Sequence, residues 1–160
     1  MQLLLAAVQS SSLAADAHES GGAVACTLVL TELTATIEAS RIDDAVGGLT
    51  LEGRLPAGQG RLVLTPERGV SGAMAALREI EVDDGTVDDA WVIRGDGPAL
   101  LLALVPALRA LAPTAPTIHV EDELLRVRFD RAVPLVELGS SVHDALALWE
   151  RAASFRLGAA

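Results

Sequence analysis

Hydrophobic and polar residues alternate with a period of two in several parts of this chain. Such alternation is typical of a β-strand with one buried and one solvated face, because successive side chains point to opposite sides of a sheet. It occurs at residues 24–30, 49–55 and 117–129. A threonine-rich run at 34–40 predicts one more strand.

The turns between these stretches predict two β-hairpins. A segment with proline and glycine predicts that 49–55 pairs with 61–65, and an acidic segment predicts that 117–120 pairs with 125–129. In the second hairpin the residues expected to face the core are Ile118, Val120, Leu125, Val127 and Phe129. Those expected to face water are His119, Arg126, Arg128 and Asp130.

A leucine-rich segment between these hairpins predicts a buried helix. Asp96 and Gly97 are suitable N-cap residues, and Pro98 fits the first helical position, where its missing N–H costs nothing. Leucines then recur as far as Leu111, and more than half of the helix circumference is apolar. Pro106 removes one backbone hydrogen bond, so we expect either a kink or two short helices.

The C-terminal segment predicts a second helix, with Gly139 and Ser140 leading into apolar residues at helical spacing over 142–153. The other expected elements are a short helix at 3–17, a loop at 41–48, a brief strand at 80–82 and an extended connector at 113–116. Together these elements predict an α+β fold, in which an antiparallel sheet with hairpins is packed by a proline-kinked leucine-rich helix and a C-terminal helix. Because no repeat or linker divides the chain, we expect a single domain over residues 1–160.

Charge limits the partners of the chain. It has 12 basic residues, all of them arginine, and 22 acidic residues, which give a net charge of −10. An acidic surface repels phosphate backbones, so we expect no nucleic acid partner unless the arginines cluster.

The cysteine content and the apolar segments indicate a cytoplasmic protein. Cys26 is the only cysteine, which excludes an internal disulfide and suits a reducing compartment. No set of zinc ligands is evident, and we expect no cofactor. The apolar start of the chain lacks the basic residues of a secretory signal, and no apolar run reaches the roughly 18 residues of a membrane span.

The second half of the chain resembles a known family. The residues concerned are Asp88, Trp91, Ile93, Asp96, Pro98, the segment Leu104–Pro106 and the hairpin Ile118–Phe129. An acidic-aromatic strand, a D-x-P turn, a proline-interrupted leucine helix, a β-hairpin and a final helix, in this order, resemble an uncharacterised bacterial family classed as a domain of unknown function. With the upstream segment Gly48–Thr65 the resemblance covers roughly residues 45–157, and it departs from the family at Val87, where an aromatic residue is usual. The resemblance implies an architecture and no catalytic residues.

An acid-rich run before the central strand invites comparison with a calcium loop. It consists of Glu79, Glu81, Asp83, Asp84, Asp88 and Asp89. A calcium loop has a glycine at its sixth position and a glutamate at its twelfth. Counted from Glu79, the sixth residue is Asp84, Gly85 comes one place late, and no glutamate is twelfth. We therefore interpret the run as a charged turn.

Ser140, Ser141, His143 and Asp144 are the residue types of a hydrolase triad. The members of a triad converge from separate elements, whereas these four lie within five positions. Ser141-x-x-Asp144 before an apolar helical run is instead close to a capping box, so we predict that Ser141 caps the final helix.

Four further signals have structural explanations. Cys26 lies on the apolar face of a predicted strand, where a thiol usually packs as a small hydrophobe. His119 is expected to be a solvent-facing strand residue. The glycines within 53–60 precede no helix, which excludes a nucleotide-binding fingerprint. The Arg-Gly-Asp tripeptide at 94–96 lies at a predicted strand-to-helix turn, which is a structural reason for these residues.

Two hypotheses for the function remain. The first is a non-enzymatic, acidic protein-interaction or assembly module with a protein partner or a second copy, favoured because 51% of the residues are hydrophobic. Salt should then tighten self-association, since it screens the net negative charge. The alternative is a hydrolase-like enzyme whose acids meet only in three dimensions. The candidate acids are Asp43, Asp44, Asp88 and Asp96. The sequence assigns no catalytic, cofactor-binding or metal-binding residue.

Overall fold

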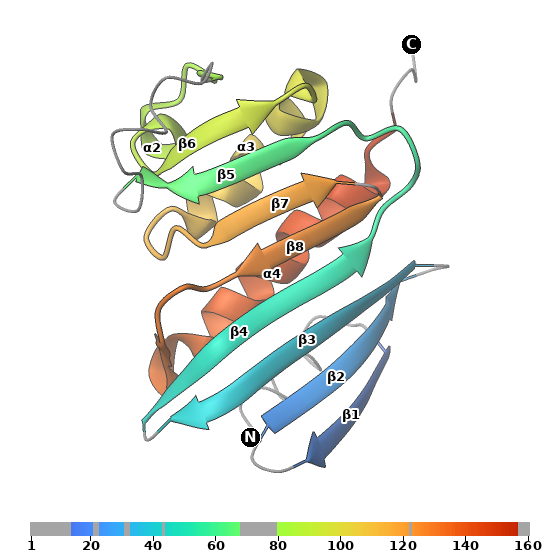
Figure 1. Cartoon of the computed structure of the whole chain (residues 1–160), viewed down its shortest axis with the longest axis vertical. Helices are drawn as coiled ribbons and strands as arrows, with labels where there is room; N and C mark the ends of the chain where they lie inside the picture. The colour runs from blue at the N-terminus through green and yellow to red at the C-terminus, as the bar shows by residue number, and fades with distance from the viewer. Residues whose placement is uncertain are drawn as a thin grey trace.

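The main structural element is one antiparallel sheet, which has nine strands in the described part of the chain (Figure 1). This computed structural model describes residues 14–20, 23–30, 33–42, 44–67, 80–121 and 123–156. The strands lie in the order β1–β2–β3–β4–β8–β7–β5–β6, and the short strand β9 pairs with β4 outside this path. Together with the helices that cover it, the sheet confirms the predicted α+β class.

The first four strands follow one another as an antiparallel meander. They are β1 (Ala14–Ser20), β2 (Ala23–Leu30), β3 (Leu33–Ile42) and β4 (Ala45–Arg54). The strands predicted at 24–30, 34–40 and 49–55 are therefore confirmed.

Two expectations for this region are wrong. The helix expected at 3–17 overlaps β1 from Ala14 onward, and its earlier residues lie outside the described part of the chain. The loop expected at 41–48 is mostly strand, because β3 and β4 stay paired as far as Ile42 and Ala45. An antiparallel connection needs as few as two residues, so polar residues near the turn do not require a long loop.

The predicted hairpin between 49–55 and 61–65 does not form. The remaining strands are β5 (Leu62–Pro66), β6 (Trp91–Gly95), β7 (Thr117–Glu121), β8 (Leu124–Arg128) and β9 (Val133–Pro134). β5 pairs with β6 and β7, whereas β4 pairs with β3, β8 and β9. The β7–β8 hairpin lies between β4 and β5, and the chain passes beyond one end of this hairpin on its way to β5 (Figure 1). Alternation shows which side chains face the core, but it does not show which strand is the neighbour.

The second predicted hairpin is confirmed. β7 and β8 pair from Thr117 opposite Arg128 to Glu121 opposite Leu124. The expected core residues are all buried, namely Ile118, Val120, Leu125, Val127 and Phe129. The residues expected to face water are half-buried or exposed, namely His119, Arg126, Arg128 and Asp130.

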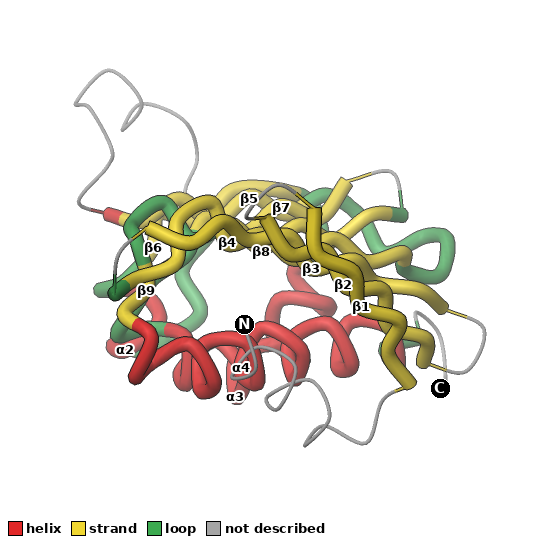
Figure 2. The backbone as a smooth tube through the Cα atoms, turned by 90° about the horizontal axis from the view of Figure 1, so that it is seen from below, coloured by secondary structure: helices red, strands yellow, loops and turns green. Residues whose placement is uncertain are grey.

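Both long helices cover the same face of the sheet (Figure 2). The helices of the described residues are α2 (Gly85–Asp88), α3 (Pro98–Leu111) and α4 (Leu135–Ser154). α3 and α4 contact each other, and α4 also contacts β4, β8 and β9. The hydrophobic core fills the space between these helices and the sheet.

α3 begins as the sequence predicts, with Gly97 as the N-cap and Pro98 in the first turn. The expectation of two short helices is wrong, because α3 runs unbroken through Pro106. Because Pro106 has no N–H, the Leu102 carbonyl loses its helical hydrogen bond. Both residues lie on the exposed side of the helix, where water can replace the missing bond. The buried side of α3 consists of Leu100, Leu101, Leu104, Ala107, Leu108 and Leu111.

α4 begins earlier than the sequence suggests. Pro134 is the N-cap residue, and the helix starts at Leu135, whose N–H donates to the Asp44 carbonyl at 3.0 Å. Ser141 therefore lies in the second turn and is buried, so the prediction that Ser141 caps this helix is wrong. The pairing of β9 with β4 fixes the chain just before the helix, and this tertiary contact decides where α4 starts.

Two shorter segments also differ from expectation. Residues 80–82 form no strand, although the first of them donates its N–H to the Ile93 carbonyl of β6 at 2.9 Å. The connector 113–116 is turned rather than extended, since the N–H of Ala115 donates to the Leu111 carbonyl at 2.8 Å.

Two tryptophans fill the core between the helices and the sheet. Trp149 of α4 is fully buried, and its indole Nε1 donates to the Arg54 carbonyl at 3.2 Å. The ring lies against Gly53 of β4, where an added Cβ would be only 2.4 Å from Nε1. Trp91 of β6 donates from Nε1 to the Pro116 carbonyl at 2.8 Å. Both contacts place a large apolar ring in the core while satisfying its N–H group.

Candidate functional site

The face of the sheet opposite α3 and α4, which we call the open face, gathers basic side chains. It is formed by the outward residues of β4, β8, β7, β5 and β6. These alternate with buried residues along β4, β8, β7 and β5, whereas Trp91, Val92 and Ile93 of β6 are all buried. Its basic residues are Arg54, Arg61, Arg94, Arg126, Arg128 and His119. Its acidic residues are Glu52 and Glu121, and Asp130, which follows β8, is bonded to Arg128. The open face is therefore basic, although the chain as a whole has a net charge of −10.

Strand register aligns several of these residues in one row across the sheet. Arg94 of β6 is opposite Val63 of β5, which is opposite His119 of β7. His119 is opposite Arg126 of β8, which is opposite Glu52 of β4. Because neighbouring strands lie about 4.8 Å apart, the three basic residues of this row lie within about 15 Å.

Exposed ion pairs hold some of the arginines. Arg61 Nε is 3.3 Å from Glu121 Oε1, and Arg126 Nε donates to the Glu52 carboxylate. All four side chains are between 41% and 61% exposed. Ion pairs as exposed as these contribute about 0–1 kcal/mol each, so carboxylates of a binding partner can replace the intramolecular ones at little cost.

His119 adds little positive charge to this face at neutral pH. Burial lowers the pKa of its imidazole below the ordinary value, and the positive charge of Arg126 lowers the pKa further. The positive charge of the open face therefore comes from its arginines.

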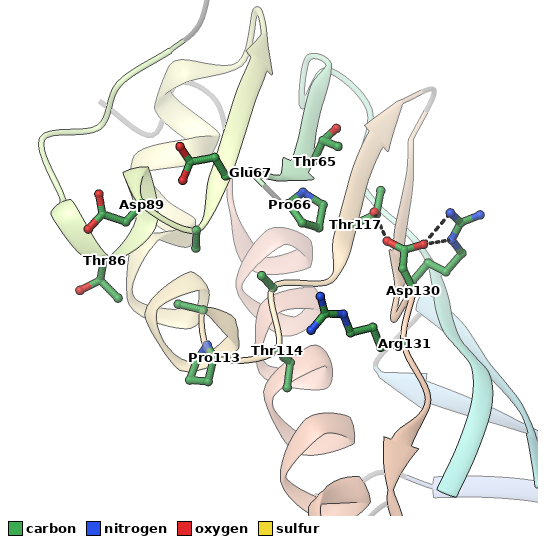
Figure 3. A pocket seen from close by; sticks show the side chains of 14 residues that line it. Thr65, Pro66, Glu67, Thr86, Asp89, Pro113, Thr114, Thr117, Asp130 and Arg131 are labelled. Carbon is green, nitrogen blue, oxygen red and sulfur yellow. Dashed lines mark hydrogen bonds and ion pairs between the residues drawn. The ribbon is translucent and has the colours of Figure 1, made fainter. Parts of the chain in front are cut away.

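A cleft of about 710 Å³ lies at the end of the sheet where β5 and β8 end and β6 and β7 begin (Figure 3). Its walls come from the end of β5, from α2 and the residues after it, and from the loops that follow α3 and β8. Polar side chains that line it include Thr65, Glu67, Asp89, Thr117, Asp130 and Arg131.

Opposite charges lie on different sides of this cleft. On the β8 side, Asp130 Oδ1 accepts from Arg128 Nε at 2.8 Å, while Arg131 has no ion-pair or hydrogen-bond partner among the described residues. On the α2 side, the carboxylates of Glu67 and Asp89 also have no side-chain partner within the described ranges. Figure 3 shows Arg131 extending into the space between the two sides.

The acid-rich run forms a braced turn. Asp84 is the N-cap of α2 and accepts from two backbone N–H groups of that helix, and its Oδ2 accepts from Arg109 Nε at 2.6 Å. The hydrogen bond from Arg109 lowers the pKa of Asp84 below its ordinary value, and the backbone donors act in the same direction. Asp88 accepts from the Val82 N–H at 3.1 Å, and Glu79 lies outside the described residues. In the part of the chain that the structure describes, no group of three or more His, Cys, Asp or Glu side chains is placed to hold a metal ion.

The acids of the enzyme hypothesis do not meet in the described structure. Asp43 lies outside the described residues, and Asp44 is at the turn between β3 and β4. Asp88 and Asp96 lie beyond opposite ends of β6, and Asp96 Oδ1 accepts from the Arg61 N–H at 2.6 Å. None of the three described acids lines the cleft.

The triad-like residues of α4 do not form a catalytic arrangement. Ser141 is buried whereas His143 is exposed, and the Ser140 hydroxyl donates to the Glu137 carbonyl at 2.9 Å. The structure has no hydrogen bond among the side chains of Ser140, Ser141, His143 and Asp144, all of which it describes.

The Arg-Gly-Asp tripeptide at 94–96 has a structural role. Gly95 has a φ of +146°, and an added Cβ would lie 1.9 Å from the Arg61 carbonyl oxygen, so this position requires glycine. The N–H of Asp96 donates to the same carbonyl at 2.9 Å. Cys26 is opposite Ile37 in the β2–β3 pairing, and its expected packing role stays a prediction.

Comparisons with protein-family models, with curated proteins and with solved structures found no match. Within the described ranges, no helix combines the length and the apolar character needed to cross a membrane. The function of the open face and of the cleft must therefore be inferred from the charges and the geometry of their side chains.

Sequence reasoning found part of the open face and missed the cleft. Alternation placed His119, Arg126 and Arg128 toward water, but their neighbours Arg54 and Arg94 join them only through the strand order. The cleft combines residues from loops that are far apart along the chain, and no local pattern marks such a combination.

Proposed function

We propose that this protein is a non-enzymatic interaction module whose open face binds a carboxylate-rich segment of a partner protein. The observation that carries the proposal is the separation of charge, with arginines gathered on the sheet face that no described helix covers. Charge complementarity of this kind speeds the encounter of two proteins and selects among partners.

The chemistry of the open face favours a protein over a nucleic acid. Proteins that bind single-stranded nucleic acid on a sheet stack bases on exposed aromatic rings. The chain has two tryptophans and two phenylalanines. Trp91, Trp149 and Phe129 are buried, and Phe155 follows α4 on the helical side.

The proposal rests on charge rather than on exposed apolar surface. Among the described residues, the large hydrophobic side chains that are exposed are Leu102 and Val136. Single exposed hydrophobic residues are common on soluble proteins and do not mark an interface. The high hydrophobic content therefore gives little support to an apolar interface on the described surface, and a homodimer stays a prediction without a defined interface.

Titration with an acidic probe tests the proposal. A fluorescein-labelled polyglutamate peptide is added at low and at physiological salt, and its fluorescence anisotropy is measured. We expect saturable binding that salt weakens, because screening reduces attraction between opposite charges. This dependence is the opposite of that expected for self-association of the acidic chain.

Two matched variants show where the probe binds. Arg126→Glu reverses a charge on the open face, whereas Arg151→Glu makes the same change at an exposed position near the end of α4. We expect Arg126→Glu to weaken binding about tenfold or more, the value of one charged hydrogen bond, and Arg151→Glu to leave it nearly unchanged. Equal effects of the two variants, no binding of the peptide, or tighter binding of a polythymidine oligonucleotide would overturn the proposal.

Three other predictions from the sequence belong to this proposal. They are the resemblance of residues 45–157 to an uncharacterised bacterial family, the single domain over 1–160 and the cytoplasmic location. The absence of catalytic residues and cofactors also stays a prediction.

A further inference from the structure

We propose that the cleft beside α2 is a second binding site, which takes a small zwitterion such as a short peptide with a free amino group and a free carboxylate. The site differs from the open face in its position at the end of the sheet and in its mixed charge, although Arg128 belongs to both. It does not depend on the function proposed above.

The charged residues of the cleft determine the class of ligand. Arg128 is already neutralised by Asp130, which accepts from both its Nε and its Nη2, the latter at 2.6 Å. Arg131 is then the cation available to a ligand, and Glu67 and Asp89 are the available carboxylates within the described residues. A charged group in a partly enclosed site gains most from a ligand group of the opposite sign.

This arrangement disfavours ligands with charge of one sign. A phosphate group at Arg131 would add negative charge to a cleft that already holds Glu67, Asp89 and Asp130. A polyamine would satisfy the carboxylates but would repel Arg131. A zwitterion places a carboxylate at Arg131 and an ammonium group near Glu67 and Asp89, which lie on the opposite side of the cleft (Figure 3).

The size and the remaining lining of the cleft fit a peptide. A volume of about 710 Å³ lies within the range of about 300–1,000 Å³ that is usual for small-ligand sites. Pro66, Ala90, Ala112, Pro113 and Ala115 supply small apolar surfaces between the charged sides. Such surfaces can contact aliphatic side chains, while the hydroxyl of Thr65 can bond to a peptide group.

Isothermal titration calorimetry with capped and uncapped peptides tests this site. The probes are trialanine, N-acetyl-trialanine, trialanine amide, inorganic phosphate and spermidine, each titrated into the full chain. We expect trialanine to bind saturably and either cap to weaken binding about tenfold or more, because each cap removes one charged contact. Failure of trialanine to bind at millimolar concentration, or equal or tighter binding of phosphate or spermidine, would overturn the proposal.

Variants assign each end of the peptide to one side of the cleft. Arg131→Gln should weaken trialanine binding as much as amidation does, with no further loss for trialanine amide, because the two changes remove the same contact. Asp89→Asn should weaken trialanine binding as much as acetylation of the peptide does. It should cause no further loss for N-acetyl-trialanine. Arg151→Gln is the control, and its binding should equal that of the unchanged protein. If Arg131→Gln and Arg151→Gln bind trialanine equally well, the cleft is not the site.

The outcomes separate this proposal from the function proposed above. Arg131 does not belong to the open face, and Arg126 does not line the cleft. Polyglutamate binding that depends on Arg126 and trialanine binding that depends on Arg131 can therefore succeed or fail independently.

Discussion

The two faces of the sheet carry different kinds of contact. On the helical face, Trp149 fits over Gly53 so closely that no larger residue can replace the glycine without movement. On the open face, Arg126 and Glu52 hold each other through an exposed contact that water or a partner can replace. Packing on one face therefore stabilises the fold, whereas the charges of the other face can change with little loss of stability. Substitutions on the two faces should accordingly separate stability from binding.

The largest loss of stability is expected at Gly53. Gly53→Ala places a Cβ 2.4 Å from Trp149 Nε1, so β4 or α4 must shift, at a cost of about 3 kcal/mol. Urea unfolding measures this change. Gly85→Ala is the matched control, since an added Cβ there has no neighbour within 4 Å. Similar stability of the two variants would show that Trp149 does not pack tightly against β4.

A smaller loss is expected at the second tryptophan of the helical face. Trp91→Phe keeps an aromatic ring but leaves the buried Pro116 carbonyl without its donor, which costs about 2 kcal/mol. The same urea unfolding experiment applies. A loss well below that of Gly53→Ala supports this order of effects, and no loss at all would mean that water reaches the carbonyl.

The braced turn before β6 should make stability depend on acid pH. The folded-state pKa of Asp84 lies below its ordinary value of 3.8, so the unfolded chain binds this proton first as the pH falls. The stabilisation is complete above pH 3.8 and is lost as the pH falls through the lower folded-state pKa. Its size is limited because the Arg109 side chain is 62% exposed.

Thermal melting along an acid titration measures this contribution. Asp84→Asn and Arg109→Gln should each lower the melting temperature at neutral pH and reduce its further fall in acid. Arg151→Gln serves as the control and should keep the acid dependence of the unchanged protein. An unchanged acid dependence in Asp84→Asn would assign the effect to other carboxylates.

The smallest effect on stability is expected on the open face. Arg126→Gln should change the free energy of unfolding by less than about 1 kcal/mol, because its ion pair with Glu52 is exposed. The same variant should weaken polyglutamate binding clearly. If it loses stability on the scale of Gly53→Ala, the two faces do not divide stability and binding between them.

The sequence predicted the local structure best where one pattern was sufficient. The alternation in β7 and β8 identified the buried side of that hairpin, and Gly97-Pro98 marked the start of α3. These signals act over a few residues, and the structure does not oppose them.

The errors arose where distant contacts decide the outcome. Ser141 looked like a helix cap, but the pairing of β9 with β4 starts α4 at Leu135. The segment 61–65 looked like the partner of 49–55, but β7 and β8 lie between the two strands. The cleft escaped prediction for the same reason, since Glu67, Asp89 and Arg131 are brought together only by the completed sheet.

The insertion of β7 and β8 between β4 and β5 has a consequence for the synthesis of the chain. β1 to β4 can pair in turn as they leave the ribosome, whereas the other edge of β4 must wait for β8, and the contact between Glu52 and Arg126 spans 74 residues. Contacts at such separation slow folding, because the intervening chain must be ordered before they form. Until then β4 is the unpaired edge of a growing sheet, and such edges recruit strands from other chains. Charged side chains on an edge strand oppose that recruitment, so Glu52 and Arg54 of β4 should protect the nascent chain until β8 pairs with this edge.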